Sequence, residues 1–158
     1  MAKLQKEILE NLNMTALYLQ LWCSGTERLI PAFRESADRF NSEKFVEIDG
    51  KSIANHYVQF ASVLETALEI LRESLVGLRK SQDDESIPPK ELLQTVMVTF
   101  SIVNREAKAM PDQGTVWRWK PDYHQVKRAN QPLDGLDNVG KWVEEMSGHL
   151  LPLYKVSR

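Results

Sequence analysis

The residues with the clearest capacity for chemistry lie between Thr115 and Arg128, in the stretch TVWRWKPDYHQVKR. Two of the chain's four tryptophans, Trp117 and Trp119, stand here with a single residue between them. Four Lys or Arg residues and one acid give the stretch a local charge of +3, in a chain whose net charge is -2. If the backbone is extended, the two tryptophans share one face.

This stretch admits three interpretations. It could be a loop whose tryptophans lie over the ends of a bundle while its basic side chains stay in solvent. It could be a protein-binding surface, because Trp, Tyr and Arg dominate interface energetics and Arg118 suits an acidic or phosphorylated partner. It could also bind single-stranded nucleic acid, with bases stacked on the rings. The candidate binding residues are Trp117, Arg118, Trp119, Lys120, Tyr123, His124, Lys127 and Arg128.

A nuclease is an extension of the nucleic-acid alternative. Within RWKPDYH, Arg118 and His124 stand six residues apart. This spacing is similar to the arginine-to-histidine motif of small helical-bundle ribonucleases of the HEPN type, and the resemblance implies ribonuclease activity. In that family the motif sits at a helix, whereas Pro121 interrupts it here.

The rest of the sequence lacks the motifs of a catalytic or cofactor site. The three histidines, His56, His124 and His149, are far apart, and no HExxH or ExxH pair occurs. No GxxxxGK[ST], GxGxxG or GxSxG motif occurs either. Cys23 ends an apolar run, which predicts a buried and inert thiol. We therefore predict a protein that is not an enzyme and that holds no metal or cofactor.

Composition indicates one soluble domain spanning residues 1–158. Apolar residues make up 42% and charged residues 27%, with 20 basic and 22 acidic side chains. That balance argues against attraction of the whole protein to nucleic acid or to an anionic membrane. A single cysteine excludes an internal disulfide. The start of the chain has no signal-peptide pattern, and MTALYLQLWCSG is too short to span a bilayer, so we predict a cytoplasmic protein.

Helical periodicity dominates the first half of the chain. A first helix is predicted from about Lys3 to Cys23, ended by Ser24-Gly25 because glycine readily takes the left-handed conformation. A shorter second helix is predicted to reach about Phe40, with Pro31 in its first turn. The connection that follows contains the turn pair Asp49-Gly50.

The strongest element is predicted from Ser52 to about Lys80. Its apolar stripe is wide, which is typical of the central helix of a bundle. Positions seven residues apart in this stripe are Tyr57, Leu64, Leu71 and Leu78. Further apolar residues outside the main stripes could close a homo-oligomer, namely Leu17, Leu21, Val58 and Val76.

Two more helices complete the predicted fold. One runs from about Pro89 to Met110, although TVMVTFSIV at residues 95–103 alternates like a strand; the flanking KELLQ and NREAKAM favour a helix. Residues 111–136 are then a long segment with three prolines. The last helix is predicted from Asp137 or Asn138 to about Leu151.

The sequence thus predicts an all-α, single-domain bundle of four long helices plus one short helix, with a long aromatic and basic segment before the last helix. We predict a non-enzymatic protein–protein interaction module, such as an adaptor, an accessory subunit or a small regulatory partner. Its contact surface would be Trp117–Arg128. The alternative is a component that binds single-stranded nucleic acid.

Overall fold

A computed structural model describes residues 4–110, 122–129 and 131–158, which form five helices and no strand. The all-α bundle of four long helices and one short helix is confirmed, although the short helix lies elsewhere than predicted. Within the described residues, no helix combines the length and the apolar character needed to cross a membrane. The helices are α1 (Lys6–Ser42), α2 (Gly50–Asp84), α3 (Lys90–Lys108), α4 (Tyr123–Ala129) and α5 (Gln131–Val156).

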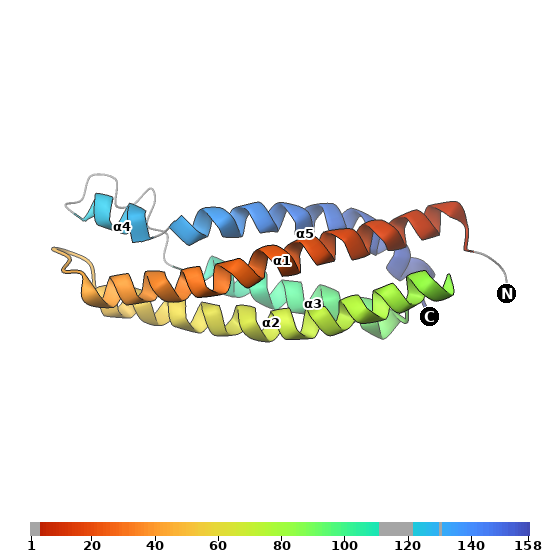
Figure 1. Ribbon diagram of the computed structural model, residues 1–158, viewed down its shortest axis with the longest axis horizontal. Coiled ribbons are helices and arrows are strands. Elements are labelled where there is room, and N and C mark those ends of the chain that lie inside the picture. Colours follow the sequence, from red (N-terminus) through yellow and green to blue (C-terminus); the bar gives the residue numbers. More distant parts are fainter. Residues whose placement is uncertain (1–3, 111–121, 130) are drawn as a thin grey trace.

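The two longest helices, α1 and α2, form an antiparallel hairpin that runs the length of the molecule (Figure 1). α5 lies along α1, α3 lies along α2, and α4 sits at the end where α1 connects to α2. At the opposite end the Lys90 N–H donates to the Arg158 carbonyl oxygen at 3.2 Å. The Lys90 ammonium also lies 4.7 Å from the ring centroid of Tyr154. These contacts tie the start of α3 to the end of α5.

α1 is continuous where the sequence analysis predicted two helices, so the predicted break at Ser24-Gly25 is wrong. Gly25 serves helix packing instead. A Cβ at this position would lie 2.7 Å from Cγ1 of Val139 and 3.0 Å from the ring of Trp142, both on α5. The absence of a side chain at Gly25 therefore lets the side chains of α5 pack closely on the backbone of α1. Pro31 lies inside the same helix, on its exposed side.

The other helix ends differ from the prediction by smaller amounts. α2 begins at Gly50, where Asp49 is the N-cap and its carboxylate accepts from the Ser52 N–H at 3.3 Å. α5 begins at Gln131 rather than at residue 137 or 138. Pro132 stands in its first turn, where a missing N–H costs nothing. Residues 123–129 and 131–136 are thus helical, in contrast to the long segment predicted for 111–136.

Residues 95–103 are helical, which confirms the preferred interpretation of TVMVTFSIV. The buried residues of this stretch are Val96, Thr99, Phe100 and Val103, a spacing that belongs to one side of a helix. The Thr99 hydroxyl donates to the Thr95 carbonyl oxygen at 2.7 Å, so its polar group is satisfied inside the helix. Burial against the bundle therefore overrides the strand-like alternation of the β-branched residues.

All five helices contribute to one hydrophobic core. The four residues predicted at seven-residue spacing on α2 are fully buried, which confirms the wide apolar stripe. Between α1 and α3, the rings of Trp22 and Phe100 meet edge to face with centroids 5.0 Å apart. Nearer the α4 end, Phe40 stacks on Tyr57 at 5.3 Å and on Phe45 at 5.6 Å. Aromatic packing thus extends from the core into the connection between α1 and α2.

We expect Gly25→Leu to lower the free energy of unfolding by about 1–3 kcal/mol, because the new side chain enters a filled space against Val139. Gly148→Leu on α5 is the matched control, since a Cβ there would meet nothing within 4 Å. The control should gain about 0.5–1 kcal/mol from better helix propensity. Urea unfolding followed by circular dichroism measures both, and equal gains in the two variants would contradict the close approach at Gly25.

Candidate functional site

The structure describes only part of the predicted binding surface. Trp117, Arg118, Trp119 and Lys120 lie outside the described residues. Tyr123 is the first residue of α4, and its side chain is likewise outside the description. The remaining three predicted residues are exposed on α4, at a spacing of three and four residues that places them on one side of the helix. We call His124, Lys127 and Arg128 the basic face of α4.

The opposite side of α4 is anchored in the protein. Val126 and Ala129 are each 1% exposed and belong to the core. The Val126 N–H donates to the Asp122 carbonyl oxygen at 3.0 Å, which starts the helix. The Gln125 side-chain amide donates to the Lys44 carbonyl oxygen at 3.3 Å, across to the connection between α1 and α2. α4 is therefore a short amphipathic helix with its basic side outward.

Asp122 makes the central contact of this region. Its side chain is fully buried, and Oδ1 accepts from the Val46 N–H at 2.7 Å. Oδ2 accepts from the N–H groups of Glu47 at 2.8 Å and Ile48 at 3.2 Å. Burial raises the pKa of the Asp122 carboxyl, but the three backbone hydrogen bonds outweigh it and hold the pKa below its ordinary value. The carboxylate thus binds the residues immediately before α4 to the loop between α1 and α2.

The burial of Asp122 changes the charge that this region presents. In the sequence, Asp122 is the one acidic residue among four basic residues between Thr115 and Arg128. In the structure its charge faces backbone amides in the interior, and α4 itself contains no acidic residue. The local signal in the sequence was an Asp directly before a helix, which predicts a cap for that helix. The actual partners are 74–76 residues away, so no local pattern identifies them.

Arg128 also borders a shallow hollow where α1 faces the junction of α4 and α5. The hollow has a volume of about 270 Å³. A second guanidinium, that of Arg39, lines it from α1 and lies 3.8 Å from the Glu35 carboxylate. Glu35 also lines the hollow, and the remaining lining residues are Leu29, Ala32, Ser36, Gln131, Pro132 and Gly135. The hollow therefore combines apolar and small residues with two arginines and one glutamate, a feature that the sequence did not predict because α1 supplies about half of it.

Two of the other groups that could carry chemistry, His149 and Cys23, are engaged in packing. His149 Nδ1 lies 3.0 Å from Asn11 Oδ1, and its ring stacks on Tyr18 at 6.2 Å, which joins α5 to α1. His56 is exposed on α2. Cys23 is buried, as predicted. Among residues 4–110, 122–129 and 131–158, no three His, Cys, Asp or Glu side chains gather where they could hold a metal ion.

No family model, curated protein or solved structure matches this chain. The features of the molecule that bear on function are therefore α4, its anchor at Asp122 and the adjoining hollow.

We expect Asp122→Asn to destabilise the folded protein by about 1–3 kcal/mol, because an amide NH₂ would face a buried backbone donor. The folded pKa of Asp122 lies below its ordinary 3.8, so ionised Asp122 stabilises the fold fully above that pH. This contribution is lost as the pH falls through the lower folded value. Thermal melts across acid pH should show a smaller loss on acidification in the variant. An unchanged melting temperature at neutral pH would contradict the anchoring role.

We expect the Cys23 thiol of the folded protein to resist thiol reagents. Burial raises its pKa from 9.0 to about 11, and the opposing effect of the Arg72 guanidinium is smaller. Two pKa units lower the thiolate fraction about 100-fold at pH 8, before restricted access slows the reaction further. The rate of labelling by a chromogenic disulfide reagent, compared with and without urea, measures this. Rapid stoichiometric labelling of the folded protein would contradict it.

Proposed function

We propose that this protein is a non-enzymatic protein–protein interaction module whose contact surface is the basic face of α4 with the adjoining hollow. The observation that carries the proposal is the burial of Asp122. That carboxylate accepts hydrogen bonds from three backbone N–H groups and does not lie on the exposed side of α4. The exposed side of α4 therefore presents His124, Lys127 and Arg128 without an acidic neighbour on the same helix. Such a surface favours an acidic partner.

The hollow supports a peptide-like partner of mixed chemistry. Arg39, Arg128 and Glu35 line it, and Arg39 lies 3.8 Å from the Glu35 carboxylate. The guanidinium of Arg128 can bind a partner carboxylate through two parallel hydrogen bonds. Arg128 makes no ion pair with any described residue. Leu29 and Pro132 supply apolar surface between the charges. A segment with an apolar side chain next to Asp or Glu fits this arrangement.

The anchoring of α4 supports binding as well. A free seven-residue helix is unstable in water, and ordering it on binding would cost affinity. Here the core contacts of Val126 and the backbone bonds of Asp122 hold the helix before any partner arrives. The basic face is thereby presented in one geometry, which favours a specific contact over a loose electrostatic one.

A role without catalysis is supported by the state of the reactive groups. The Cys23 thiol has a raised pKa, and the Asp122 carboxylate has no access to solvent. His149 is occupied with Asn11. A nucleophile or general base needs a perturbed group that is also open to substrate, and the buried Cys23 thiol and Asp122 carboxylate are closed.

We expect Lys127→Glu/Arg128→Glu to abolish capture of the protein partner, because two attractive charges become repulsive. Affinity purification from a nuclease-treated lysate of the native host measures this. Lys141→Glu/Lys155→Glu on α5 is the matched control, with the same change in net charge at two exposed positions. It should keep the partner. Circular dichroism confirms folding of both variants.

The same experiment separates the nucleic-acid alternative. A partner that disappears on nuclease treatment, with affinity for a single-stranded RNA probe that falls steeply as salt rises, would replace the proposal with nucleic-acid binding. Equal loss in both charge variants would show that net charge, rather than the basic face of α4, governs the contact.

A further inference from the structure

The solvent-exposed side of α3 carries an ordered pattern of residues. Positions separated alternately by four and three residues are all exposed, and they read acid, hydroxyl, apolar, apolar, base along the helix. The two apolar members are large and open to solvent, Val98 by 55% and Ile102 by 42%. We call Glu91, Thr95, Val98, Ile102 and Arg105 the α3 stripe. Alternate spacing of three and four residues is the pattern by which two helices pack along a common seam.

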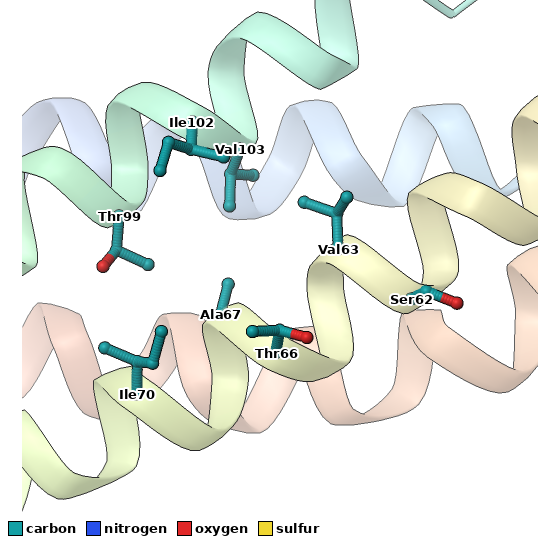
Figure 2. Close-up of a pocket in the computed structure, with 8 residues that line it drawn as sticks. All are labelled: Ser62, Val63, Thr66, Ala67, Ile70, Thr99, Ile102 and Val103. Atoms are coloured by element: carbon teal, nitrogen blue, oxygen red, sulfur yellow. The ribbon is translucent and has the colours of Figure 1, made fainter.

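An uncharged groove adjoins the α3 stripe and extends its apolar surface onto α2. The groove has a volume of about 310 Å³ and lies between the two helices. Figure 2 shows the side chains of both helices on the two sides of its opening. Ile70, on the α2 side, is 36% exposed. The lining residues are Ser62, Val63, Thr66, Ala67, Ile70, Thr99, Ile102 and Val103. Aliphatic side chains of a partner helix would meet no charged group there.

The two charged ends of the α3 stripe are not satisfied within the described part of the chain. Glu91 makes no ion pair there. Among the described residues, the guanidinium of Arg105 pairs only with Glu106, at 4.0 Å, and its side chain is 75% exposed. Both charges can therefore pair with another molecule.

The arrangement is symmetric about Val98. Glu91 stands seven residues before it and Arg105 seven residues after it, which places each charge about 10 Å from Val98 along the helix axis. A second α3 laid antiparallel, with the two-fold axis at Val98, brings each Arg105 beside the partner's Glu91. A parallel arrangement would bring equal charges together. This is the self-complementarity that an isologous interface requires.

We propose that the α3 stripe and the adjoining groove form a self-association surface, in which α3 packs antiparallel against α3 of a second copy of this chain around Val98. The surface shares no residue with the basic face of α4, so this inference stands independently of the proposed partner of α4. The apolar centre would supply the contact area, and two Glu91–Arg105 pairs would fix the direction and register of the helices.

Charge exchange tests the proposed pairing directly. We expect sedimentation velocity to show a concentration-dependent dimer for the wild type. Glu91→Arg alone and Arg105→Glu alone should each raise the dissociation constant about tenfold or more, because each puts two like-charged pairs in the interface. The double variant Glu91→Arg/Arg105→Glu should recover the wild-type dimer. An equimolar mixture of the two single variants should form heterodimers, since each then faces its opposite charge.

A matched valine controls for the apolar centre. Val98→Glu should give a monomer, whereas Val156→Glu, at a 42% exposed position on α5, should leave the dimer intact. Circular dichroism confirms that each variant is folded. A monomeric wild type at every concentration would overturn the proposal, including the case in which a different protein co-purifies and Val98→Glu removes it. A dimer insensitive to Val98→Glu would also overturn it, and single variants that fail to combine would overturn the antiparallel pairing.

Discussion

The close approach of α5 to α1 at Gly25 is the constraint on which the bundle depends. α1 is the helix against which α2, α4 and α5 all pack, so its unbroken course defines their positions. A side chain at Gly25 would displace Val139 and Trp142 and move α5 outward. α5 begins two residues after α4 ends, so the position of α5 constrains where α4 can lie. The geometry of the basic face is therefore linked to a packing contact far from it.

The elements that periodicity predicted are those whose stability comes from one amphipathic side. The apolar stripe of α2 and the helical state of residues 95–103 could be predicted from local spacing and from the hydrophobic effect alone. The prediction failed where a residue's local preference competes with a distant contact. Gly25 has the preference of a helix terminator, but its neighbours on α5 are more than a hundred residues away in the chain. Helical periodicity was equally weak between residues 123 and 136, where Pro132 and charged residues interrupt it.

The candidate site was also predictable from the sequence only in part. Composition alone indicated that a basic cluster lies near the end of the TVWRWKPDYHQVKR stretch, and the structure places His124, Lys127 and Arg128 together on one side of α4. The role of Asp122 depends on three amides of a loop that no sequence pattern marks as a carboxylate site. Arg39 likewise becomes part of the hollow only because α1 continues past Gly25. Trp117 and Trp119 lie outside the described residues, so their proposed part in binding stays a prediction.

The hydrogen bonds of Asp122 also bear on the order in which the chain folds. They close a loop of about 75 residues, and the chain must lose the conformational entropy of closing that loop before these bonds can form. The connection between α1 and α2 spans only residues 43–49, so forming the α1–α2 hairpin has a smaller loop-closure entropy cost and should come first. During synthesis it also leaves the ribosome earlier. We expect the amides of Val46, Glu47 and Ile48 to face water in that early hairpin, which makes its tip the last part of the molecule to become native.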